Sequence, residues 1–90
     1  METNKIMVVN SPVSRFQKIY VVKDGAMVDQ LGVGIDDLVE VLFALVEKYG
    51  IEEIDLGGNL EFTSKIANSI KQNISQYNIH NLIVNQIEQF

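Results

Sequence analysis

The sequence contains no cysteine, no tryptophan and only one proline in 90 residues. The absence of cysteine excludes disulfide bonds, thiolate chemistry and cysteine-ligated zinc. The single proline and the 47% of apolar residues are typical of a globular chain rather than a disordered one. The length predicts a single domain, residues 1–90, with a thin hydrophobic core.

Long apolar runs are also absent. No run approaches the roughly 18 residues of a membrane span, and the first residues, METNKIMVVNSP, lack the order of a signal peptide. We therefore expect a cytoplasmic protein without membrane contact. The abundance of Ile, Asn and Lys is typical of an AT-rich genome and hints at a bacterium or its phage.

The formal net charge of -5 is concentrated in one part of the chain. Eight of the twelve acidic residues fall within residues 31–62, where Lys48 is the only basic residue. This balance argues against broad nucleic-acid binding, which depends on a basic surface that neutralises phosphates. The acidic segment would suit a basic partner, although a solvated helix surface with ordinary solubility charge is the simpler interpretation.

Three apolar segments in the first third of the chain predict strands over residues 5–10, 17–23 and 26–31. Asp24-Gly25 lies between the second and the third. This pair predicts a type I′ hairpin turn, because such a turn needs positive φ at both central positions. Gly32 and Gly34 are expected to lie between the hairpin and the helix that follows it.

The remaining segments predict two helices and two strands. Closely spaced apolar residues predict a helix over about residues 35–49, ended by Gly50. The apolar surface of this helix is wide, and either the second helix or a second copy of the protein would have to cover it. Alternating acidic and apolar residues predict a strand over residues 51–56, and the spacing of Ile66, Ala67, Ile70, Ile74 and Tyr77 predicts a helix. A last strand is expected within residues 79–87. The fold class is therefore α/β, with a mixed sheet of about five strands in the order β-β-β-α-β-α-β and both helices on one face.

This order, with Gly57-Gly58-Asn59 between a strand and a helix, resembles the ribonuclease H-like fold and its small resolvase and pre-resolvase members. The resemblance covers nearly the whole chain and implies metal-binding acids on the first and fourth strands, plus a final helix over the second sheet face. This chain offers Asn10 on the first strand and Asp55 on the fourth, and it leaves no residues for that helix. Because two-metal chemistry needs several carboxylates, we expect no catalysis, no metal and no cofactor, and one open sheet face.

Two site predictions follow from the residues. Gly57, Gly58 and Asn59 at a helix start, with Arg15 on a loop, form a candidate anion-binding site, although a plain turn with Asn59 or Thr63 as helix cap is the simpler interpretation. An interaction surface is predicted from acids and one aromatic residue: Asp36, Asp37, Glu40, Phe43, Glu47 and Asp55. Asp55 is expected to be exposed on the open sheet face. His80, the only histidine, has no companion for metal binding.

We therefore predict a small non-enzymatic protein-interaction module that acts as a homodimer or as a subunit or modulator of a larger partner. The first alternative is a degenerate nucleic-acid-binding module that uses Arg15 and a few lysines. The second is a metal-dependent nuclease that uses Asp55 with Asp29 or Asp36.

Overall fold

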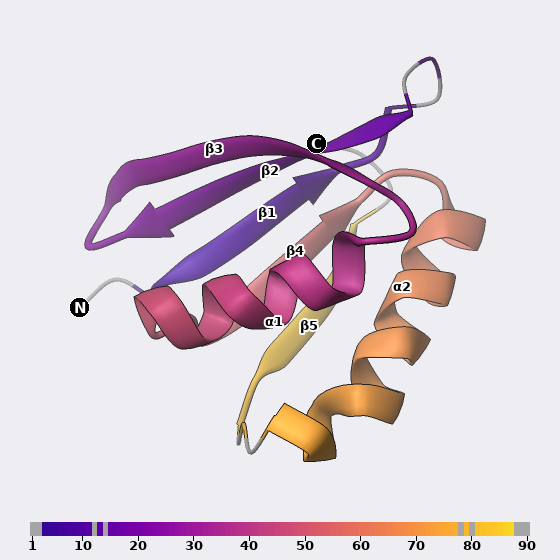
Figure 1. The fold of residues 1–90 in the computed structure, drawn as a ribbon. Coiled ribbons are helices and arrows are strands. Elements are labelled where there is room, and N and C mark those ends of the chain that lie inside the picture. The colour runs from indigo at the N-terminus through magenta and orange to yellow at the C-terminus, as the bar shows by residue number, and fades with distance from the viewer. Residues whose placement is uncertain (1–2, 12, 14, 78, 80, 88–90) are drawn as a thin grey trace.

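The computed structural model describes residues 3–11, 13, 15–77, 79 and 81–87. It contains a five-stranded mixed sheet in the order β3-β2-β1-β4-β5 (Figure 1). The strands are β1 (Lys5–Val9), β2 (Phe16–Lys23), β3 (Ala26–Gly34), β4 (Glu53–Gly57) and β5 (Ile83–Ile87). β1 pairs antiparallel with β2 and parallel with β4, and β4 pairs parallel with β5. The predicted α/β class, element order and mixed sheet are therefore confirmed.

The β2–β3 hairpin turns where the sequence predicts it. Asp24 and Gly25 have φ values of 53° and 81°, so both central positions of the turn lie in the left-handed region. β3 continues to Gly34, beyond the predicted end at Leu31, because residues 32–34 keep pairing with the start of β2. Gly32 and Gly34 therefore lie inside a strand.

Both predicted helices are present. α1 (Leu38–Tyr49) begins three residues later than expected, because Ile35, Asp36 and Asp37 form a turn in which the Asp37 amide donates to the Gly34 carbonyl. It ends at Gly50, as predicted. α2 (Leu60–Asn73) continues into the short 3-10 helix η1 (Ile74–Tyr77). Neither helix in the described part of the chain is long and apolar enough to span a membrane.

The core lies between one sheet face and the two helices, which lie on the same side of the sheet (Figure 1). Alternate strand residues reach it, as expected for period-2 side-chain geometry; they include Ile6, Val8, Ile19, Val21, Ile54 and Leu56. α1 contacts α2 and adds Leu42 and Phe43. The second helix therefore covers part of the wide apolar surface predicted for the first.

The opposite sheet face, called the open face below, carries no helix in the described part of the chain. The strand registers place alternate residues there: Lys5, Met7, Val9, Phe16, Lys18, Tyr20, Val22, Met27, Gln30, Gly32, Gly34, Glu53, Asp55, Gly57, Ile83, Asn85 and Ile87. Antiparallel strands often leave one face to water, whereas parallel strands are nearly always covered on both. It is thus unusual that none of the described helices covers this side of β1, β4 and β5.

Candidate functional site

Four polar residues meet on the part of the open face formed by β1, β4 and β5, and together they are called the open-face cluster: Lys5, Glu53, Asp55 and Asn85. They come from three adjacent parallel strands. The β1–β4 register places Lys5 beside Glu53, and the β4–β5 register places Asp55 beside Asn85. Since opposed residues of neighbouring strands project to the same side, strand pairing alone brings these side chains together.

Asp55 is the centre of the open-face cluster. Its Oδ2 lies 3.2 Å from the Lys5 Nζ, and its Oδ1 accepts a hydrogen bond of 2.9 Å from the Asn85 Nδ2. The Asn85 Nδ2 also donates to Glu53. Asp55 is only 6% exposed, so the expectation that it would be an exposed surface acid is wrong. Its neighbours on β1 and β5 cover it, and its charge is compensated by Lys5.

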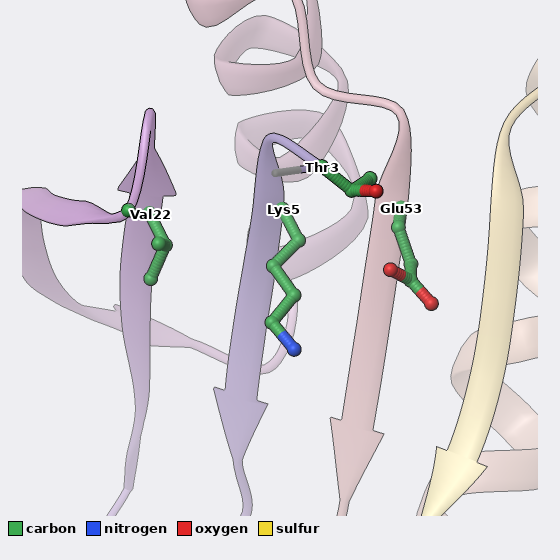
Figure 2. A pocket seen from close by; sticks show the side chains of 5 residues that line it. Thr3, Lys5, Val22 and Glu53 are labelled. Carbon is green, nitrogen blue, oxygen red and sulfur yellow. The ribbon is translucent and has the colours of Figure 1, made fainter. Parts of the chain in front are cut away.

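A hollow of about 400 Å³ adjoins the cluster. Figure 2 shows the side chains of Lys5 and Glu53 on neighbouring strands at this hollow, with Val22 on the other side of Lys5. Thr3 and Gly25 complete its lining. The hollow therefore combines an ammonium group, a carboxylate and apolar surface. Such a surface can accept polar side chains of a partner and fix its orientation.

The cluster has the character of a compensated ion pair. No buried side-chain nitrogen or oxygen in the described residues lacks a hydrogen-bond partner. No group of three His, Asp or Glu side chains in that part of the chain is arranged to hold a metal ion. Asp29, one of the acids considered with Asp55 for metal chemistry, accepts a hydrogen bond from the Tyr49 hydroxyl of α1 and therefore lies on the helix side of the sheet. The sheet separates Asp29 from Asp55.

Two groups of the predicted anion site are already engaged in hydrogen bonds. The Gly58 amide donates to the Ile87 carbonyl, and the Asn59 Oδ1 caps α2 by accepting from the Phe62 amide at 2.9 Å. The capping interpretation of Asn59 is thereby confirmed. Gly58 has a φ of 141°, and a Cβ atom placed on it would lie 2.6 Å from the Asn10 Cβ. The close approach of two strand ends thus accounts for this glycine.

Arg15 lines a different hollow, of about 370 Å³, together with Asp36 and Asp37. Asn59 instead lines a neighbouring hollow of about 210 Å³, and Ile35 borders both. The structure therefore gathers Arg15 with two of the predicted interaction acids rather than with the glycine pair.

The other predicted interaction residues lie on α1 and differ in exposure. Glu40 and Glu47 are exposed, as are Asp36 and Asp37 before the helix. Phe43 is 1% exposed and stacks on Tyr77 with 4.1 Å between the ring centroids. Phe43 therefore belongs to the core and offers nothing to a surface. His80 lies outside the described residues.

Sequence reasoning missed Lys5, Glu53 and Asn85 as site residues. The available signal was the pair Glu53 and Asp55, which are two positions apart on one strand and therefore share a face. Nothing local could assign Lys5 and Asn85 to them, because the pairing of β4 with both β1 and β5 brings in residues about 30 to 50 positions away.

Comparisons with known proteins find a similar fold but no related sequence. The sequence matches no protein-family model, and no curated protein matches it. Among solved structures, Pelota from Archaeoglobus fulgidus is similar over 97% of this chain, with a TM-score of 0.59 and 10% sequence identity. The match covers 27% of Pelota, so this chain spans about a quarter of the length of that protein.

Proposed function

We propose that this chain is a non-enzymatic protein-interaction module whose open face is covered by a protein, either a second copy or a larger partner. We further propose that its fold is ribonuclease H-like and that its origin is bacterial or phage. The element order, and the junction of an antiparallel hairpin with parallel strands, support the proposed fold. In Pelota, the region of similar fold is part of a longer chain with several domains.

The observation that carries the proposal is the open face over the parallel strands. β1, β4 and β5 are five residues long each, and at about 3.3 Å per residue and 4.8 Å between strands they form a patch of roughly 16 by 14 Å. Met7, Val9 and Ile87 lie there, half-buried, and Ile83 is 55% exposed. Exposed apolar side chains are typical of the core of a protein interface, and the ion pair beside them adds no net charge.

The charges of the open face favour a protein over nucleic acid. Lys5 and Lys18 are balanced by Glu53 and Asp55, so the face has no positive excess to neutralise phosphates. The degenerate nucleic-acid module therefore remains the less supported alternative.

The test compares three purified proteins: the natural chain, Ile83→Glu and Leu60→Glu. Leu60 is the matched control, since it is 60% exposed but lies at the start of α2, away from the open face. Each protein is cross-linked at several concentrations and is also used to capture partners from a lysate treated with nuclease. We expect Ile83→Glu to lose the specific cross-linked or captured species that the other two retain. Equal retention by all three, or retention that nuclease abolishes, would contradict the proposal.

A further inference from the structure

The sheet has two edge strands, which differ in length. In the described part of the chain, β3 and β5 are the outermost strands. β5 contains five residues, whereas β3 contains nine and is the longest of the five described strands. An edge strand presents unpaired N–H and C=O groups, with which a strand of another chain can pair, and proteins limit this pairing by keeping edges short, charged or covered. β3 is therefore the edge that most needs protection.

The composition of β3 supplies little of that protection. Its sequence, AMVDQLGVG, contains no Lys, Arg or Pro, and Asp29 is its only charged residue. Met27 and Val28 are 58% and 45% exposed, so apolar surface lies along the strand. One irregularity interrupts the pairing with β2 near Val28, but residues 30–34 pair with β2 in regular register. Residues 30–34 thus form a regular edge to which another strand could be added.

Asp29, beside this regular segment, is hydrogen-bonded through both carboxylate oxygens. Its Oδ1 accepts a hydrogen bond of 2.9 Å from the Gln30 backbone amide, and its Oδ2 accepts one of 2.9 Å from the Tyr49 hydroxyl. A carboxylate does not fit between two paired strands that are about 4.8 Å apart, so the Gln30 amide points away from β2 and towards the outer edge. The carboxylate therefore occupies a donor that an added strand would use.

The end of α1 holds the Asp29 side chain in this position. Tyr49 is the last residue of α1 and is half-buried. The Lys48 Nζ lies 5.2 Å from the centre of the Tyr49 ring, a distance at which the cation attracts the ring. A contact between helix and sheet thus keeps Asp29 at the edge of β3.

A strand that paired with the edge of β3 would have to displace this carboxylate. Asp29 would lose the hydrogen bond from Gln30 and would lie against the added backbone with less access to water. Because a charged group that loses its partners and its water is strongly unfavourable, Asp29 opposes such pairing. The strand most readily available is β3 of a second copy, since a two-fold axis perpendicular to the sheet pairs two identical edges antiparallel.

We propose that Asp29 is an edge-blocking residue: its carboxylate, held by Tyr49, covers the Gln30 amide and prevents β3 from pairing with β3 of a second copy. The chain then keeps its own sheet instead of extending it across two copies. This inference goes beyond the proposed function and does not depend on it, since β3 and the exposed Ile83 of β5 lie at opposite edges of the sheet.

The first experiment measures the self-association of Asp29→Ala by sedimentation equilibrium, at concentrations up to about 1 mM so that small interfaces are detected. Asp36→Ala is the matched control, because it removes the same carboxylate and the same charge at an exposed position outside the strands. We expect the association constant of Asp29→Ala to be about tenfold or more above that of Asp36→Ala. Tyr49→Phe, which keeps the ring but releases Asp29, should show a smaller increase.

The second experiment adds Gln30→Pro to Asp29→Ala. Proline lacks an N–H and is tolerated on an edge strand where the N–H faces solvent. We expect the double variant to associate no more than Asp36→Ala, whereas association caused by unfolding would increase with the added proline. Hydrogen exchange of the Gln30 amide in dilute protein is a separate readout, and it should be about tenfold faster in Asp29→Ala than in Asp36→Ala.

Three results would overturn the inference: Asp29→Ala associates no more than Asp36→Ala, the added proline leaves the association of Asp29→Ala unchanged, or the Gln30 amide exchanges equally fast in the two single variants. The proposed function is tested separately. Ile83→Glu added to Asp29→Ala should leave the new association in place, because it acts at the opposite edge. Loss of that association would assign it to the open face and would also overturn the inference.

Discussion

Substitution of Gly58 by alanine should destabilise this protein severely, even though it adds a single methyl group. That methyl group would lie 2.6 Å from the Asn10 Cβ, well inside van der Waals contact, and the φ of 141° is one that L residues rarely adopt. Backbone strain of this kind costs about 1–3 kcal/mol, and overpacking adds about 1–3 kcal/mol. A chain of 90 residues has a total stability of only about 5–13 kcal/mol. We therefore expect Gly58→Ala to lose about 2–6 kcal/mol.

The assay is urea unfolding at low micromolar protein, which gives the free energy of unfolding by linear extrapolation. Gly34→Ala is the control, since a Cβ atom there meets nothing and φ is not positive, so its stability should be unchanged or slightly raised. The double variant Gly58→Ala/Asn10→Gly removes the clash between the two Cβ atoms but keeps the strained φ. It should recover about 1–3 kcal/mol relative to the sum of the single changes. A Gly58→Ala loss below about 0.5 kcal/mol, or no such coupling, would refute the explanation of this glycine.

Further predictions concern the open-face cluster, the cap of α2 and the core. Asp55→Ala and Lys5→Ala, combined in a double-mutant cycle, should show a coupling of about 1 kcal/mol that decreases at 1 M salt; a salt-independent or absent coupling would contradict the ion pair. Asn59→Ala should cost about 1 kcal/mol in urea unfolding, whereas Asn68→Ala at an exposed position of the same helix should not destabilise; equal effects would argue against the cap. Phe43→Ala should cost about 3–5 kcal/mol, and a loss below 1 kcal/mol would be incompatible with its burial.

Much of the fold could be predicted because its signals are local. The Asp24-Gly25 turn needs only its own two residues, and Gly50 and Asn59 act on the nearest turns of their helices. The start of α1 was predicted too early, since apolar Ile35 continues the helical pattern although residues 35–37 form a turn.

The site was far less predictable, because its residues meet through strand pairing and helix packing. Asp55 reads as a surface acid in its own strand, yet β1 and β5 bury it and supply Lys5 and Asn85 as partners. Phe43 shows the same effect in the core, where Tyr77 covers it.

The sequence by itself determined the number and order of the strands and helices along the chain, the hairpin turn, the end of α1 at Gly50 and the alternation of acidic and apolar residues in β4. These depend on interactions within a few residues and on the alternation of side chains along a strand. Only the tertiary structure decided that β1 lies between β2 and β4 and that Lys5, Glu53, Asp55 and Asn85 meet on the open face. Strand order and register result from the packing of the whole core, and no single segment contains that information.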